Sequence, residues 1–346
     1  MNNPWSNIAD NSFENIQLKK KIISNHPEIL NQFKFNSSGS KFYTASVCKL
    51  KSFDPNTLIS SEYDLKHNLI ERFSSFSSCS SIENISTNKF NDNLLYFTLY
   101  PEIIIFDTNS NEIINKVNCN ISRWNCDDDC LIEASKHHAN IIFFTVKEGV
   151  FRRIKSYDLS TSKIESIFSF YTKSEDSIFL NHPTNKNIFA VVDNSKILFF
   201  DTKGFICKAN FSPYATIDTA IEGSNTSDQK RVMSIKFNSN GSKLVVNMSN
   251  SPSFILDTVV FKKEIISIRE EILNADFMRD DNYIVASRLN NDIIFYSRSK
   301  KKVIKTINQD VSVFNFALSP TERLLAVNTL EMVDEEDYTV VKTYKF

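Results

Sequence analysis

Cysteine and histidine residues gather in one stretch of the chain, where together they could bind a zinc ion. The group consists of Cys119, Cys126, Cys130, His137 and His138. Zinc sites use thiolate and imidazole ligands, often from cysteine pairs about two to four residues apart, and the Cys126–Cys130 spacing is within reach. A second matched pair is missing from the sequence, however. We therefore expect structural or exposed cysteines here, and no metal or other cofactor.

Three consecutive aspartates lie between two of these cysteines, at 127–129. Carboxylates could bind calcium, but an EF-hand loop needs a longer alternating series of oxygen ligands with a central glycine and a terminal glutamate. That series is absent from the sequence. The aspartates are therefore predicted to lie in a polar connecting loop.

The sequence carries none of the common catalytic motifs. It has no Gly-x-Ser-x-Gly, no P-loop, no His-Glu-x-x-His and no glycine-rich dinucleotide turn. Three further histidines, His26, His67 and His182, are isolated from other reactive side chains. We therefore predict that the protein is not an enzyme and has no small-molecule substrate.

A short phrase recurs about every 40 to 56 residues along the chain, and a period in this range is typical of a β-propeller. Most copies place a hydrophobic residue before an aspartate. The copies are Ser52-Phe53-Asp54, Phe106-Asp107-Thr108, Tyr157-Asp158-Leu159, Phe200-Asp201-Thr202, Leu256-Asp257-Thr258 and a degraded Phe295-Tyr296-Ser297. Each aspartate is expected to start the turn after the third strand of a blade, where its carboxylate can accept backbone N–H groups.

Each repeat predicts four short strands, because runs of β-branched and aromatic residues are bounded by Asn-, Gly- and Ser-rich turns. In the clearest unit the strands are expected at 232–237, 243–247, 253–256 and 262–268. Only five glycines occur in the chain, so asparagine is expected at many turns, since it also tolerates positive φ. Aromatic residues at strand spacing are expected in the core: Phe33, Phe35, Phe237, Phe277 and Phe316.

Seven such units fit the chain, and six blades with an irregular linker is the alternative count. The units run over 29–75, 76–119, 120–170, 171–213, 228–269, 270–308 and 309–346. The prediction is thus one all-β propeller domain over 1–346, with 1–28 as an N-terminal extension. Within it, 16–23 is the candidate closing strand that completes the last blade. Irregular stretches are expected at 120–130, 214–231 and 330–337.

These motifs resemble those of WD-repeat propellers, although the Gly-His pair is absent and Trp-Asp is represented by Phe-Asp, Tyr-Asp or Leu-Asp. Residues 187–307 are similar to the middle blades of the WD-repeat subunit shared by the COMPASS histone methyltransferase and the cleavage-and-polyadenylation machinery. The resemblance implies a scaffold that binds protein subunits of a nuclear complex on chromatin or pre-mRNA ends. It also implies linkage to the phosphorylated tail of RNA polymerase II.

Two other functions stay open from the sequence. A trafficking, autophagy or cytoskeletal scaffold would have the same repeats. A propeller enzyme would need clustered acids, histidines or a metal in the central channel, and no repeat supplies them at matching positions.

Basic side chains are the candidate contacts to a partner, because lysine and arginine can pair with phosphate groups on a peptide or nucleic acid. Lys230 and Arg231 lead into a first strand, a position that tends to lie on the top rim of a propeller. Arg152 and Arg153 follow Phe151, as in the Phe-Arg-Arg-Gly phosphoinositide motif of autophagy propellers. Ile154 replaces that glycine, so no membrane binding is expected. The clusters at 19–21 and 298–302 are interpreted as solvated turns.

The composition limits the partners and the compartment. A formal net charge of -1 gives no global field that would favour nucleic acid or an acidic membrane. The first residues contain no apolar signal-peptide core, and no stretch approaches a membrane span. Six scattered cysteines suit reduced thiols. The protein is therefore predicted to be nuclear or cytoplasmic and not secreted.

Overall fold

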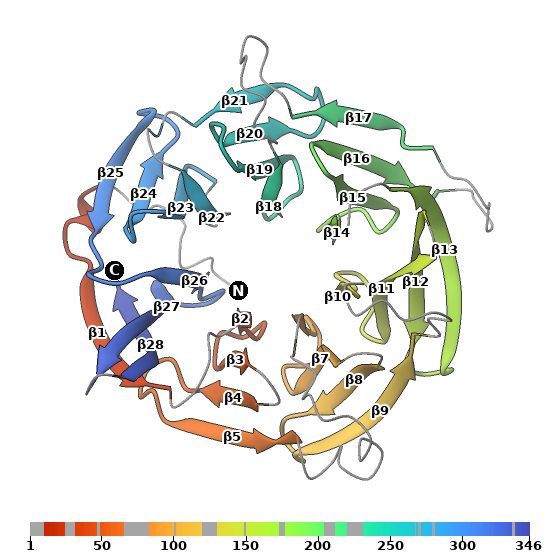
Figure 1. Cartoon of the computed structure of the whole chain (residues 1–346), viewed down its shortest axis with the longest axis horizontal. Coiled ribbons are helices and arrows are strands. Elements are labelled where there is room, and N and C mark those ends of the chain that lie inside the picture. The colour runs from red at the N-terminus through yellow and green to blue at the C-terminus, as the bar shows by residue number, and fades with distance from the viewer. Residues whose placement is uncertain are drawn as a thin grey trace. The chain divides into compact units, whose positions relative to one another are not determined.

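The fold is an all-β propeller of seven blades. The computed structural model describes residues 10–24, 32–46, 49–65, 82, 84–99, 102–119, 130–148, 150–172, 177–203, 212–219, 231–266, 268, 271–278, 281–333 and 336–346. Seven sheets, each of four strands, make up the fold (Figure 1). Neighbouring strands are antiparallel, as in the pairs β2–β3, β15–β16 and β23–β24. The prediction of seven blades is confirmed, and the six-blade alternative is wrong.

The chain divides into two compact units, which we describe separately. The first consists of Met1–Asn15, Gly149–Arg153 and Ser166–Val313. It contains a short 3-10 helix and three complete blades. Their elements are η1 (Asp10–Phe13), then β14 (Ser177–Asn181), β15 (Ile188–Asp193), β16 (Lys196–Asp201) and β17 (Ala215–Asp218), then β18 (Val232–Phe237), β19 (Lys243–Met248), β20 (Phe254–Asp257) and β21 (Lys263–Ile265), then β22 (Ile272–Phe277), β23 (Tyr283–Arg288), β24 (Ile293–Ser297) and β25 (Lys302–Ile307).

The second unit consists of Ile16–Glu148, Ile154–Glu165 and Phe314–Phe346. Two of its blades follow each other in the chain: β2 (Gln32–Phe35), β3 (Phe42–Ser46), β4 (Lys49–Phe53) and β5 (Ser60–Asp64), then β6 (Ile85–Thr87), β7 (Leu94–Leu99), β8 (Glu102–Asp107) and β9 (Glu112–Asn118). A third sheet contains β10 (Ile132–Ala134), β11 (Ile141–Glu148), β12 (Phe151–Asp158) and β13 (Lys163–Tyr171), and the residues of its last two strands are shared between the units.

The last blade of the second unit joins distant parts of the chain. Strand β1 (Gln17–Ile23) pairs antiparallel with β28 (Glu336–Lys345), which follows β26 (Val313–Leu318) and β27 (Leu324–Val333) in the sheet (Figure 1). Glu331 of β27 binds Lys21 of β1 and, at 2.7 Å, Lys342 of β28. The buried Lys51 ammonium donates to the Ser24 carbonyl at 2.6 Å. Strand β1 is thus the fourth strand of this sheet.

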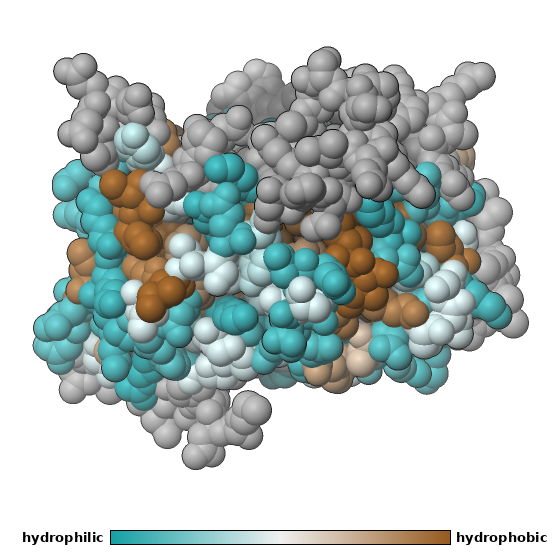
Figure 2. Space-filling model, turned by 90° about the horizontal axis from the view of Figure 1, so that it is seen from below, coloured by the Kyte–Doolittle hydropathy of each residue, from teal (hydrophilic) through white to brown (hydrophobic). Residues whose placement is uncertain are grey.

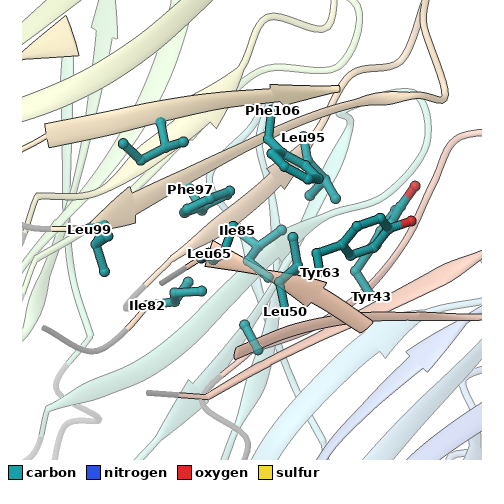
Figure 3. Packing of buried hydrophobic residues seen from close by; sticks show 12 residues of the cluster. Tyr43, Leu50, Tyr63, Leu65, Ile82, Ile85, Leu95, Phe97, Leu99 and Phe106 are labelled. Atoms are coloured by element: carbon teal, nitrogen blue, oxygen red, sulfur yellow. The ribbon is translucent and has the colours of Figure 1, made fainter. Parts of the chain in front are cut away.

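The hydrophobic core lies between neighbouring blades. One cluster joins the β2–β5 and β6–β9 blades, with side chains such as Leu50, Tyr63, Leu95 and Phe106 in contact (Figure 3). Similar clusters join β14–β17 to β18–β21 and β18–β21 to β22–β25. A four-stranded blade cannot bury both faces alone, so stacking against neighbours is what stabilises each blade.

The aromatic residues predicted for the core are placed largely as expected. Phe33, Phe35, Phe277 and Phe316 are buried. Phe237 is half-buried and packs against the cluster between β14–β17 and β18–β21.

The repeated aspartates start the turns between third and fourth strands, as predicted. Asp54 accepts the backbone N–H groups of Asn56 and Thr57, both at 2.8 Å. Equivalent bonds at 2.8 or 2.9 Å join the carboxylate to the residue two positions later at Asp107, Asp158, Asp201 and Asp257. The carboxylate thus accepts hydrogen bonds from N–H groups of the turn that have no backbone acceptor in the sheet.

A second regularity follows in the same turns, four positions after the aspartate. The residue there has a left-handed backbone with φ between 55° and 59°, as seen at Leu58, Asn111, Ser162 and Phe261. Lys301, four positions after Ser297, has φ 51°. Asparagine occupies left-handed positions in other turns, at Asn194, Asn250 and Asn291, which confirms the expectation that it replaces glycine.

Two stretches that were predicted to be irregular contain strands. Ala215–Asp218 forms β17, the outer strand of its blade. Strands β27 and β28 stay paired through Val333 and Glu336, so the region 330–337 is largely a hairpin. Residues 120–129 and 220–230 lie outside the described residues. Among the described residues, no helix is long and apolar enough to cross a membrane.

Candidate functional site

A cleft of about 210 Å³ lies between the β14–β17 and β18–β21 blades of the first unit. It is formed by the turn before β15, the turn between β18 and β19, the turn after β20 and residues that flank β17. Its lining consists of His182, Ile188, Phe199, Tyr214, Asn240, Gly241, Ser242, Thr258 and Val259. The cleft therefore combines apolar and aromatic walls with a few polar groups, the usual make-up of a binding site.

His182 fixes the turn that forms one side of the cleft. Its Nδ1 accepts the backbone N–H groups of Thr184 and Asn185 at 3.2 and 3.0 Å. The imidazole proton consequently lies on Nε2, which donates to the Gly241 carbonyl at 3.1 Å. The ring also packs edge-on against Phe237, with centroids 5.1 Å apart. His182 is thus a structural residue that joins the two blades.

Gly241 is required where it faces this histidine. Its φ is +78°, and a Cβ added there would come within 2.1 Å of His182 Cε1. Only glycine satisfies both the left-handed backbone and the close approach of the ring.

Two aromatic residues that line the cleft, Phe199 and Tyr214, pack against Phe261. The Phe261 ring lies 5.4 Å from that of Phe199 and 6.3 Å from that of Tyr214. Partial burial raises the pKa of the Tyr214 phenol above its ordinary value, and the Asp201 carboxylate raises it further. The phenol is therefore protonated at neutral pH and can donate a hydrogen bond to a ligand.

The turn after β20 exposes two valines at the mouth of the cleft. Val259 is 74 % exposed and Val260 is 69 % exposed. The corresponding positions of the other described turns hold Asn and Thr after Asp54, Asn and Ser after Asp107, and Ser and Thr after Asp158. In this turn, valines stand where the other turns have polar residues. Because both side chains are exposed, they add no hydrophobic stabilisation to the chain itself. Figure 2 shows apolar residues interspersed with hydrophilic ones on one face of the molecule.

The turns around the cleft carry more positive than negative charge. Lys186, Lys203 and Lys262 are exposed on them, and Lys243 is half-buried. Against these stand three carboxylates. Asp201 and Asp257 accept N–H bonds within their own turns, and Asp281 accepts from Asn238 Nδ2 of the turn between β18 and β19 at 2.8 Å. The N–H groups of Val260 and Val259 hold the pKa of Asp257 below its ordinary value, and Lys243 contributes to the same shift. The surroundings of the cleft are therefore basic.

His182 makes hydrogen bonds to the backbone through both ring nitrogens, and the described residues that line the cleft include no carboxylate, thiol or lysine amine. Within the described part of the chain, no three His, Cys, Asp or Glu residues are placed to hold a metal ion.

The described basic residues that were predicted to contact a partner do not line the cleft. Arg231 is exposed and precedes β18, at the opposite end of that strand from the cleft, where its N–H donates to Ser249 Oγ at 3.1 Å. Arg153 is half-buried on β12. Arg152 is completely buried, so no partner reaches its guanidinium in this conformation. Lys230 lies outside the described residues.

The group considered for zinc is divided by the fold. Cys119 and Cys130 lie together, with their Sγ atoms 3.7 Å apart. The N–H groups of His137 and His138 donate to Ser135 Oγ in the turn that follows β10, whereas Cys130 precedes that strand. Cys126 and the aspartates at 127–129 lie outside the described residues.

The two lysine-rich clusters have mainly structural surroundings. The cluster at 19–21 lies in strand β1, so its interpretation as a turn is wrong. Lys20 donates to the Thr57 carbonyl at 3.0 Å, and Lys21 binds Glu331. Residues 298–301 form the turn between β24 and β25, as expected. Arg298 of that turn binds Glu264 at 2.9 Å.

The cleft itself was not predicted from the sequence. One feature of the sequence could have indicated the cleft. Among the repeated turns that the structure describes, only the turn after Asp257 has two valines at positions where polar residues are expected. The meeting of this turn with His182 and Tyr214 depends on how two blades pack, which a single repeat does not encode.

Comparison with known proteins gives a match in structure but not in sequence. No protein-family model matches the chain, and no curated protein matches it. A solved structure that is similar is the β-propeller domain of Cps50 (Swd1) from Myceliophteria thermophila, with a TM-score of 0.68 and 10 % sequence identity. The match covers 96 % of this chain and 99 % of that one. At this identity, the likeness shows that the two chains share the β-propeller fold.

Proposed function

We propose that this protein is a non-catalytic scaffold, a single propeller domain that holds other subunits in a multi-protein complex. The observation that carries the proposal is the pair of exposed valines, Val259 and Val260, beside a cleft lined by Phe199 and Tyr214. Apolar groups in a turn add nothing to the stability of the monomer while they face water, but they favour association when a partner covers them.

The occupant that fits the cleft is a peptide segment of another subunit, with one apolar side chain and acidic residues beside it. The aromatic walls would take the apolar side chain, and the Tyr214 hydroxyl and Asn240 can bond polar groups of the peptide. Lys186, Lys203 and Lys262 supply the complementary charge. Such complementarity speeds association and selects against basic partners.

For the complex, we propose a nuclear assembly that acts on histone methylation or on mRNA 3′ ends. Support comes from the sequence resemblance to the subunit shared by those two machineries and from the structural likeness to Cps50 (Swd1), a COMPASS propeller. In this proposal Arg231 and Arg153 provide a second contact, to a phosphorylated peptide. A trafficking or cytoskeletal scaffold is the alternative.

The test compares two exposed substitutions of equal chemistry. Val259→Asp introduces a charge at the cleft, while Met332→Asp does the same in the second unit at a side chain that is also 74 % exposed. Affinity purification from the native host, followed by mass spectrometry, should recover methyltransferase or polyadenylation subunits with wild type and Met332→Asp, and lose at least one of them with Val259→Asp.

Two results would overturn parts of the proposal. Recovery of coat or autophagy proteins would move the function to the alternative class. An unchanged set of subunits with Val259→Asp would remove the cleft as the docking site and leave the scaffold role to other surfaces.

A further inference from the structure

Two cysteines from different blades lie side by side in the second unit. Cys119 directly follows β9, and Cys130 precedes β10. They are 2 % and 4 % exposed and belong to one hydrophobic cluster. Their Sγ atoms are 3.7 Å apart, and neither cysteine is in a disulfide.

This distance is close to what a disulfide requires. An S–S bond is about 2.05 Å long, so the sulfur atoms must approach by roughly 1.7 Å for the bond to form. A metal site is a poorer account of the pair, because no third ligand accompanies it among the described residues. His137 and His138 lie beyond the far end of β10.

We propose that Cys119 and Cys130 form a reversible redox pair that peroxide converts to a disulfide. One thiolate attacks a peroxide oxygen, the O–O bond breaks, and a sulfenic acid and hydroxide form. The second thiolate then attacks the sulfenic sulfur, the S–S bond forms and the oxygen leaves as hydroxide. The two protons released when the thiols ionise convert the two hydroxides to water. Overall, two thiols lose two electrons and two protons, and one hydrogen peroxide becomes two waters.

The geometry explains why the reaction would stop at the disulfide. Burial limits the access of peroxide, so the first oxidation is slow compared with that of an exposed thiol. The second thiol already lies at 3.7 Å, so it captures the sulfenic acid before another peroxide arrives. The product links the last strand of one blade to the first strand of the next and closes residues 120–129 into a loop.

The sequence allows a direct test by peptide mapping. Trypsin cleaves after Lys116, Arg123 and Lys136, which separates the two cysteines into peptides 117–123 and 124–136. The full chain with Cys48→Ser, Cys79→Ser, Cys126→Ser and Cys207→Ser retains only this pair. After treatment with hydrogen peroxide, the two peptides should appear joined, and dithiothreitol should separate them. The midpoint of thermal unfolding should rise on oxidation, because the crosslink restricts the unfolded chain.

Matched controls keep the result interpretable. Adding Cys119→Ala or Cys130→Ala to this background should abolish both the joined peptide and the thermal shift. Mapping the wild-type chain covers the case in which the fourfold variant does not fold, provided that fragment ions of peptide 124–136 show whether Cys126 or Cys130 carries the link. The proposal is overturned if the joined peptide is absent, if Cys126 provides the link instead, or if the purified protein holds one zinc ion per chain through these thiols.

Discussion

At the scale of single residues, the repeated aspartate and the left-handed residue four positions later form one turn device. The carboxylate accepts backbone N–H groups at the start of the turn, and the left-handed residue returns the chain to the fourth strand. Asp54 and Leu58 show both parts, and the buried Leu58 side chain adds packing. The aspartates are therefore structural, as the sequence predicted.

Removing one of these carboxylates should destabilise the turn. For Asp54→Ala we expect a loss of about 1 kcal/mol in the free energy of unfolding, the usual contribution of such hydrogen bonds. Denaturant titration measures the loss. The matched control is Asp310→Ala, at an exposed position outside the repeated turns, and an equal loss in both variants would contradict the role of Asp54.

The contact between Gly241 and His182 predicts non-additive mutations. Gly241→Ala should lower the free energy of unfolding by roughly 2–3 kcal/mol, because it adds backbone strain to a clash with the imidazole. In the His182→Ala background the same substitution should cost less, since the clash is removed and the strain at φ +78° remains. Additive effects in the double-mutant cycle would show that the ring does not limit this position.

Left-handed residues without packing should tolerate glycine best. Lys301 is exposed with φ 51°, so Lys301→Gly should raise the free energy of unfolding by about 1 kcal/mol. Phe261 has nearly the same backbone but packs on Phe199. Phe261→Gly should therefore be destabilising. Thermal unfolding of both variants measures whether each substitution raises or lowers the stability. A loss of stability in both variants would contradict the strain argument.

At the scale of elements, the blade that contains β1 depends on contacts between segments far apart in the chain. Glu331 of β27 binds Lys21 of β1 and Lys342 of β28. Burial alone would raise the pKa of Glu331, but the two lysines outweigh it and hold the pKa below its ordinary value. This ion group ties three strands of one sheet together.

The lowered pKa of Glu331 predicts a pH-dependent contribution. A carboxyl that ionises more readily when folded stabilises the protein above its ordinary pKa of 4.5, and this contribution disappears as the pH falls through the folded value. Glu331→Gln should thus cost roughly 1–2 kcal/mol at pH 7 and much less in acid. Urea unfolding at several pH values measures the difference, with the exposed Glu112→Gln as control. A pH-independent difference would contradict the ion group.

Removing β1 should leave β28 with an unpaired edge. A chain that begins at residue 24 loses the register from Gln17–Lys345 to Ile23–Val340, and we expect a lower midpoint of thermal unfolding and more self-association. A separate peptide with residues 16–23 should restore the midpoint. Failure of the peptide to bind the truncated chain would show that β1 contributes little to this sheet.

At the scale of the whole molecule, the sequence predicted what each repeat contains but not what adjacent repeats form together. The Asp-centred phrase predicted the turns, and the strands of the 232–268 unit match closely, with β18 at Val232–Phe237. Strand β17 and the end of the β27–β28 hairpin were not predicted, because the sequence around 214–218 and 330–337 is polar. Arg152 was predicted to lie at the surface because nothing in its local sequence indicates burial, but its side chain is buried.

The candidate site is harder to predict for the same reason. His182, Tyr214 and Val259 come from separate turns in two blades, and only their packing brings them to one cleft. Hydrophobic periodicity describes which face of a strand is buried, but not which turns become neighbours.

The pairing of β1 with β28 also has a consequence for synthesis. The ribosome makes residues 17–23 first among the described strands and residues 336–345 last, so β1 waits for its partner while six blades emerge. Three consecutive lysines, at 19–21, suit a strand that stays in water meanwhile, because charge discourages pairing with the wrong edge. This blade can therefore close only after β28 has been made.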